Sequence, residues 1–155
     1  MKNRIIDKDI VLIPYFPNEE VTYQWYQDKD ICKQVDNIDG TYSMERLQAM
    51  YKYVSTHGEC YYIKYRGVLV GDVSLKDDGE VSIVVCKEYQ NKHIGRRCIK
   101  GIIELASEKG MKEVKAQIYS FNLQSKKMFL NVGFIQQDEE WYIYPLKQKR
   151  EISNL

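Results

Sequence analysis

A strand, a basic turn and a helix within residues 80–101 constrain the fold of this chain more than any other segment. Val81–Val85 is a short apolar run, and residues 90–97 read Gln-Asn-Lys-His-Ile-Gly-Arg-Arg. A helix is predicted next, because Ile99, Ile102, Ile103 and Ala106 recur at helical spacing before the stop at Gly110. The segment therefore predicts an α/β chain in which a helix begins beside the end of a strand.

This arrangement favours the binding of a phosphate or diphosphate at the turn. The first backbone N–H groups of a helix have no partner within the helix, and the helix dipole adds partial positive charge there. Gly95 lets a ligand approach the backbone closely, and Lys92, Arg96 and Arg97 add positive charge. A basic turn before a helix is more often simply solvated, so the motif needs its structural context.

Composition limits the class of protein. The chain has 155 residues, 44% hydrophobic and 29% charged, which is typical of one globular domain with a core of its own. Its 23 basic and 22 acidic residues argue against a surface built throughout for nucleic acid. No apolar run reaches the roughly 18 residues of a membrane span, and the N-terminus does not resemble a signal peptide. The cysteines form no C-x-x-C pair. We expect one cytoplasmic domain over residues 1–155, with free thiols, no metal, a core at about residues 10–146 and a charged tail at 147–155.

The rest of the chain predicts alternating elements without a linker. Strands are expected at residues 10–13, 60–65, 68–75, 80–85, 114–118 and 141–146. Asn18, Ser43 and Asn122 are good N-caps for three further helices. The strands at 80–85 and 114–118 should run parallel, because a helix connects them. The order β-α-α-β-β-β-α-β-α-β predicts an α/β (α+β) fold with a mixed, mostly antiparallel central sheet flanked by helices.

Two motifs in this order resemble those of the GNAT superfamily of N-acetyltransferases, and the resemblance covers about residues 10–146. The family's pyrophosphate loop, Gln/Arg-x-x-Gly-x-Gly/Ala, is matched by residues 90–95. Its second signature, Asn-x-x-Ser/Ala…Tyr-x-x-x-Gly-Phe, is matched by Asn122, Ser125, Gly133 and Phe134. The resemblance implies the GNAT fold and acetyl-coenzyme A as cosubstrate. It also implies direct transfer of an acetyl group to a primary amine of a small molecule or a protein N-terminus.

The chain departs from the family pattern at two positions. His93 stands where the family has its first loop glycine, and histidine adopts left-handed or bridge backbone conformations better than most residues. Phe129 stands where many members have the tyrosine that can protonate the departing thiolate, and phenylalanine has no proton to give. The opening helix, with Trp25-Tyr26-Gln27-Asp28, is similar to that of the family branch that contains ribosomal-protein N-terminal and aminoglycoside acetyltransferases.

The resemblance implies a role for each part of the site. Glu80 matches the carboxylate that some members use as a general base, although it is also a suitable polar residue beside a turn. Tyr142 and Tyr144 are candidates for the acid that protonates the departing thiolate, a role that Phe129 cannot fill. Contacts to the cosubstrate are expected from Ile83, Val84, Val85, Gln90, Asn91, Lys92, His93, Ile94, Gly95, Arg96, Arg97, Asn122, Ser125 and Phe129. The acceptor pocket is expected at Trp25, Tyr26, Asp28, Asp36 and Trp141.

Two other classes of function stay open from the sequence. A protein with this fold can keep its coenzyme A pocket and serve as a sensor or interaction module, which the missing tyrosine favours. A small α/β RNA-binding domain would need exposed aromatic residues on a central strand beside a basic face, and the sequence has no such pattern. We expect an amine substrate, no nucleic acid and no membrane as partners, and a monomer or homodimer.

Overall fold

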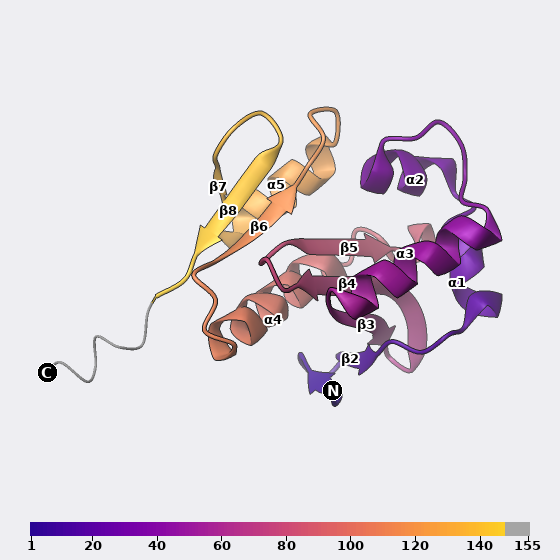
Figure 1. The fold of residues 1–155 in the computed structure, drawn as a ribbon, viewed down its shortest axis with the longest axis horizontal. Coiled ribbons are helices and arrows are strands. Elements are labelled where there is room, and N and C mark those ends of the chain that lie inside the picture. The colour runs from indigo at the N-terminus through magenta and orange to yellow at the C-terminus, as the bar shows by residue number, and fades with distance from the viewer. Residues whose placement is uncertain (148–155) are drawn as a thin grey trace, which may run out of the picture.

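The computed structural model describes residues 1–147 and contains two β-sheets set at an angle to each other (Figure 1). The first is antiparallel with the order β1-β2-β3-β4-β5. Its strands are β1 (Arg4–Ile5), β2 (Ile10–Pro14), β3 (Gly58–Tyr65), β4 (Val68–Lys76) and β5 (Val81–Val85). The second has the order β6-β8-β7 and consists of β6 (Glu113–Gln117), β7 (Ile135–Gln136) and β8 (Trp141–Pro145). Every ladder is antiparallel, as the sequence predicts for most of the sheet.

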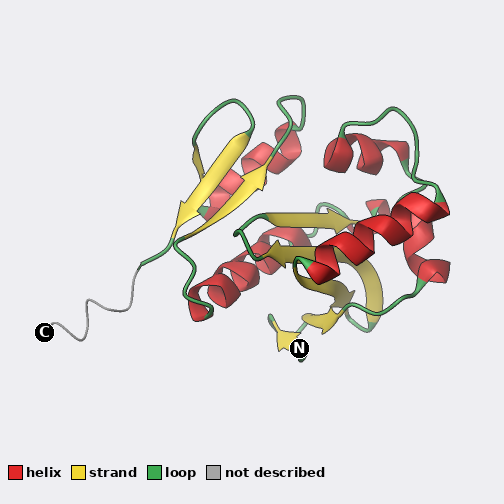
Figure 2. Cartoon of the chain, viewed as in Figure 1, coloured by secondary structure: helices red, strands yellow, loops and turns green. Residues whose placement is uncertain are grey.

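Helices cover both faces of the first sheet (Figure 2). The α-helices are α1 (Glu19–Trp25), α2 (Lys29–Asp36), α3 (Met44–Thr56), α4 (Ile94–Glu108) and α5 (Leu123–Val132), with a 3₁₀ turn at Lys87–Tyr89. Helices α1 to α3 share one apolar core with β3 and Val84. Helices α4 and α5 share the other core with both sheets. The α/β fold class expected from the sequence is confirmed.

Local sequence signals explain most element ends. Ser43 accepts a hydrogen bond from the backbone of the first turn of α3 (3.1 Å), and Asn122 does the same for α5 (3.2 Å). Both predicted caps are confirmed. Asn18 stands at the N-cap position of α1, but its side chain makes no capping hydrogen bond, so that part of the prediction is wrong. Arg66 and Gly67 both have positive φ (48° and 85°), the conformation of the tight β3–β4 hairpin turn.

Helix α2 was not expected from the sequence. Asp28 caps it by accepting hydrogen bonds from Asp30 N (2.9 Å) and Ile31 N (3.2 Å). Asn37 ends it in a left-handed conformation, with φ 53°. The eight residues of α2 lie against β5, which brings the segment after α1 to the edge of the first sheet.

Strands β5 and β6 meet at one point and then separate. A single parallel bridge joins Glu80 to Lys115, so the predicted parallel direction is confirmed. No further pairing joins β5 and β6 within residues 1–147, and the two strands belong to different sheets. The continuous sheet expected from the sequence is therefore split, and β5 is an edge strand.

The free edge of β5 carries unpaired backbone groups. In an antiparallel pair, alternate residues point their N–H and C=O groups toward the partner strand. Lys76 N donates to Glu80 O (2.9 Å) and Cys86 N donates to Val70 O (2.8 Å), which fixes the phase of this alternation. Val81, Ile83 and Val85 therefore direct their backbone groups away from β4. The side chain of Gln90 donates to Val85 O (2.9 Å), in agreement with that assignment.

A buried carboxylate lies in the core of the α1–α3 face. Asp72 of β4 accepts hydrogen bonds at Oδ2 from the hydroxyl groups of Tyr26 (2.7 Å) and Tyr51 (2.8 Å). Burial raises the pKa of Asp72 to about 6, although the two hydrogen bonds act to lower it.

The domain boundaries stay a prediction. The expected charged tail at 147–155 lies, apart from Lys147, outside the described residues.

Candidate active site

A cavity of about 450 Å³ opens where β5 and β6 separate. Strand β5 forms one wall, and the end of β6 with helix α5 forms the other. The loop before α4 closes one end, and α2 adds a third side. The lining consists of Ile31, Gln34 and Val35, residues 80–85, 89–91, 93–96 and 116–119, and Asn122, Gln124, Ser125, Lys127, Met128, Phe129 and Asn131.

The first turn of α4 faces this cavity without a side-chain cap. His93 is the N-cap residue, with φ 61° and ψ 19°, and its side chain makes no capping hydrogen bond. The left-handed conformation expected for His93 is confirmed, and Asn91 shares it with φ 64°. The N–H groups of the first turn are therefore available to a ligand, and the helix dipole makes an anion the favoured one.

Gly95 leaves space beside these N–H groups. A β-carbon added to Gly95 would meet only Met128 Cε at 3.7 Å and Ile83 Cδ1 at 3.9 Å, which are ordinary contacts. Its φ is not positive, so the backbone itself does not require glycine here. The missing side chain therefore widens the cavity at the point where the uncapped helix begins.

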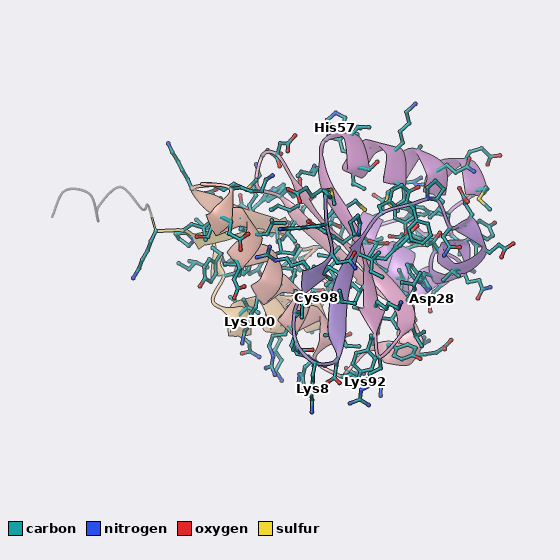
Figure 3. All side chains as sticks on the ribbon, turned by 90° about the horizontal axis from the view of Figure 1, so that it is seen from below. Lys8, Asp28, His57, Lys92, Cys98 and Lys100 are labelled. Carbon is teal, nitrogen blue, oxygen red and sulfur yellow. The ribbon has the colours of Figure 1, made fainter. Side chains whose placement is uncertain are left out.

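Only part of the basic turn faces the cavity. Arg96 lines it, whereas the Arg97 guanidinium bonds to Asp7 (2.9 Å) and Asp9 (3.4 Å) at the start of β2. Lys92 is exposed and lies at the periphery of the molecule (Figure 3). Lys127 of α5 lines the cavity as well, although the sequence motifs gave no reason to single it out.

Helix α5 contributes a polar and an apolar part to the wall. Asn122 is buried and caps the helix, while Ser125 lines the cavity one turn later. Phe129 follows on the same side, 4% exposed, with its ring edge-on to Phe134 at 4.9 Å between centroids. The predicted residues of this helix are thus brought to the same cavity as the loop before α4.

Glu80 lies at the opposite end of β5 from the loop. Its side chain lines the cavity with 22% exposure, and its Oε1 pairs with Lys76 Nζ at 2.9 Å. Its backbone N–H donates to Asp78 Oδ1 (3.0 Å), so the turn before β5 fixes the position of Glu80. The carboxylate therefore stands at the narrow end, where β5 and β6 meet.

The sequence profile described as "Acetyltransferase (GNAT) family" matches residues 20–134, which span both α4 and α5 with the cavity between them. The chain belongs to this family. Members are acetyl-CoA-dependent acyltransferases, so the protein is an acyltransferase, and the family resemblance found in the sequence is confirmed. The alternative of a coenzyme A-binding sensor or interaction module is not favoured.

Solved structures share the whole fold at low sequence identity. A GNAT acetyltransferase from Bacillus anthracis has a TM-score of 0.76 at 13% identity, covering 89% of this chain and 95% of that chain. The acetyl transferase from Salmonella typhimurium that modifies the N-terminal serine of ribosomal protein L7/L12 has a TM-score of 0.76 at 10% identity, covering 94% and 99%. The microcin C7 self-immunity acetyltransferase MccE, solved with acetyl-CoA and AMP, has a TM-score of 0.71 at 18% identity, covering 91% and 94%.

The two tyrosines predicted as acids do not line the cavity of this acetyltransferase. Tyr142 of β8 is buried opposite Ala116, and Tyr144 packs over Gly133 and Phe134. Among the described residues, the tyrosines that line the cavity are Tyr89 and Tyr119.

Tyr119 follows β6, and its ring stacks on Phe121 with 5.8 Å between centroids. The pKa of Tyr119 is raised, first by burial and then by the negative charges of Asp36, Glu140 and Glu80. Tyr119 therefore lines the cavity two residues past the end of β6, beyond the point where β6 meets Glu80.

The residues predicted for the acceptor pocket do not line the main cavity. Trp25 is buried edge-on to Tyr62, and Tyr26 is held in the core by Asp72. Asp36 binds Tyr42 and Arg46, and Trp141 lies under the ammonium group of Lys115. Asp28 lines an adjoining pocket of about 510 Å³.

Three residues of α2 line the main cavity in their place. Ile31 and Val35 are one turn apart on the helix, and Gln34 lies between them on the same side. Their spacing after the Asp28 cap was a readable helix signal, but eight residues are too few for a firm periodicity.

Residues 1–147 contain no group of three or more His, Cys, Asp or Glu side chains arranged to hold a metal ion. None of the helices described is long and apolar enough to span a bilayer.

Proposed function

We propose that this acetyltransferase moves the acetyl group of acetyl-CoA directly to a primary amine inside the cavity between β5 and β6. The observation that carries the proposal is the joining of three features in one cavity. These are the uncapped first turn of α4, the free backbone edge of β5 and the carboxylate of Glu80.

The cosubstrate fits one end and one wall of this cavity. The N–H groups at Gly95 and Arg96 would bind its pyrophosphate, with Arg96 and Lys127 supplying positive charge. The outward N–H and C=O groups of Val81 and Ile83 would pair with the amide groups of the pantetheine arm, as an added strand pairs with a sheet edge. This pairing would direct the thioester toward Glu80.

The chemistry requires deprotonation of the amine, alignment of the reacting atoms and accommodation of the thiolate. Glu80 is the acidic residue among those that line the cavity, and we assign it the role of general base, directly or through water. Phe129 lines the cavity but cannot donate a proton, so Tyr89, Tyr119 or water is left to protonate the leaving sulfur.

Thiol release from acetyl-CoA in the presence of an amine panel tests the proposal. The panel should include small amines, amino acids, aminoglycosides and peptides with free N-termini, with mass spectrometry identifying an amide product. Calorimetry with acetyl-CoA runs in parallel. Tight binding of acetyl-CoA without acetylation of any amine class would overturn the proposed transfer.

A further inference from the structure

The charged groups that line the cavity are separated by sign. The basic side chains of the lining, His93, Arg96 and Lys127, all belong to the loop before α4 or to the helices α4 and α5. Glu80 is the acidic member of the lining, and it stands at the other end of β5. One end therefore suits a polyanion, and the other end offers one carboxylate to a cation.

The acidic residues near α2 do not add to that carboxylate. Asp28, Asp30, Asp36 and Asp39 are absent from the lining of the main cavity. Each already has a partner. Asp28 caps α2, and the pairs are Asp30 with Lys87 (3.7 Å), Asp36 with Arg46, and Asp39 with Lys33 (3.2 Å). Glu80 itself shares its charge with Lys76. Among the described residues that line the cavity, Glu80 is the one carboxylate, so the lining offers direct compensation to a single positive charge.

The wall of the cavity that runs from Glu80 along β5 to α2 is uncharged and partly apolar. Ile31 and Val35 of α2 and Val84 of β5 supply hydrocarbon, and Val84 belongs to the core shared with α2. Gln34, Ser82 and Gln117 are neutral polar residues of the same lining. An ammonium group placed against this wall would lose its hydration without gaining a partner, which costs free energy.

We propose that the acceptor is a primary amine with a single ammonium group on an uncharged, partly apolar stem. Glu80 binds its amine, and the stem lies along β5 toward Val84, Ile31 and Val35. This inference rests on the proposed function and adds the class of acceptor to it. Both a small alkylamine and the free α-amine of an uncharged peptide have this chemistry, whereas polyamines and aminoglycosides do not.

The reaction stays balanced with this acceptor. Its ammonium group loses one proton to Glu80 or water, and the nitrogen lone pair forms a C–N bond with the thioester carbonyl carbon. The C–S bond breaks with its electron pair on sulfur, and the nitrogen loses a second proton as the amide forms. One proton returns to sulfur, so one proton is released overall.

Two acceptors with the same four-carbon chain, one with a single amine and one with two, provide the first test. We expect kcat/KM for butylamine to exceed that for 1,4-diaminobutane at least about tenfold, in the range that one mismatched group produces in a binding pocket. Uncharged peptides with a free N-terminus form a second arm, compared with the same peptides carrying lysine at position two. The arm with the higher kcat/KM identifies the source of the amine. Preference for the diamine, a polyamine or an aminoglycoside would overturn the inference while leaving acetyl transfer intact.

A change at Val35 provides a gain-of-function test. Val35→Glu adds a second carboxylate to the apolar wall, and Val35→Gln is the matched control with the same length and no charge. Relative to Val35→Gln, Val35→Glu should raise kcat/KM at least about tenfold for at least one diamine in the series from 1,4-diaminobutane to 1,10-diaminodecane, because the chain must reach from Glu80 to position 35. It should leave butylamine no better. Equal values for the two variants, with acetyl-CoA affinity unchanged, would contradict the inference. Absence of transfer to every amine would overturn the proposed function together with it.

Discussion

Gly95→Ala tests the proposed cosubstrate site most directly, because the fold does not require glycine at this position whereas the proposed ligand uses the space that glycine leaves. The added β-carbon would contact only Met128 Cε and Ile83 Cδ1, at 3.7 and 3.9 Å, so the free protein has room for it. Alanine is the better helix former by up to about 1 kcal/mol in a helix interior, and less in a first turn. The melting temperature of the free protein should therefore stay the same or rise slightly.

The bound state should respond in the opposite direction. A phosphate oxygen that hydrogen-bonds the N–H groups around Gly95 would approach the backbone through the space that the new methyl group fills. Hydrogen bonds to charged groups contribute about 1.5–3 kcal/mol each, so the loss of one weakens binding about 10- to 100-fold. Calorimetry with acetyl-CoA should measure this loss in the same protein whose stability is unchanged.

Two controls make the result specific. Gly40→Ala adds a β-carbon that meets nothing within 4 Å, and it should leave acetyl-CoA affinity unchanged. S-acetyl-pantetheine has the same thioester without the pyrophosphate, so Gly95→Ala should not change its kcat/KM. Unchanged acetyl-CoA affinity in a folded Gly95→Ala protein would refute the reasoning. An equal loss for acetyl-CoA and acetyl-pantetheine would also refute it, because it would locate the defect away from the pyrophosphate.

Three further changes probe the chemistry and the core. Glu80→Gln should lower kcat by roughly 10²–10⁴-fold at neutral pH, with a smaller loss as pH rises. Lys76→Gln is the control: it removes the same ion pair but keeps the carboxylate, so it should retain most of the activity. Equal pH–rate profiles for wild type and Glu80→Gln would assign Glu80 to structure. Asp72 has a raised pKa in the fold, so the native state holds its proton more tightly than the unfolded chain does, and the free energy of unfolding should fall by about 3 kcal/mol as pH rises from about 4 to about 6. Chemical denaturation of Asp72→Asn across that window should show this fall removed, and the same slope in both proteins would contradict it. Phe129→Tyr should fold and should speed single-turnover acetyl transfer, because it adds an acid to the cavity wall, and loss of both rate and acetyl-CoA affinity would mean that Phe129 serves only packing.

The parts of the site that were predictable depend on short stretches of chain. A cap and a left-handed residue are fixed by a few neighbouring residues, so Asn122 and His93 were read correctly. Helix α4 begins at Ile94, inside the segment 90–97 that the sequence predicted as a turn. The two family motifs added the order of these pieces along the chain. The resulting prediction of the cosubstrate loop and α5 facing each other agrees with the common cavity that they line.

Charge near the loop could not be assigned in the same way. Lys92, Arg96 and Arg97 looked equivalent in the sequence, but Arg97 is bonded to Asp7 and Asp9, about ninety positions away. The separation of roles among neighbouring basic residues therefore depends on which distant strand lies beside each one. Lys127 is the opposite case: it lines the cavity, although nothing in the local pattern of α5 marks it as part of the lining.

The acceptor side was the least predictable part for a related reason. An acidic segment such as the one from Asp28 to Asp39 reads as an attractive surface for a cation, since the sequence does not reveal how each carboxylate is paired. In the fold, a cap and three cations occupy these acids, and α2 presents Ile31 and Val35 to the cavity instead. The residues that face the acceptor are thus the apolar ones between the charges. The selectivity of this enzyme should accordingly follow the hydrocarbon of its substrate rather than the number of its positive charges.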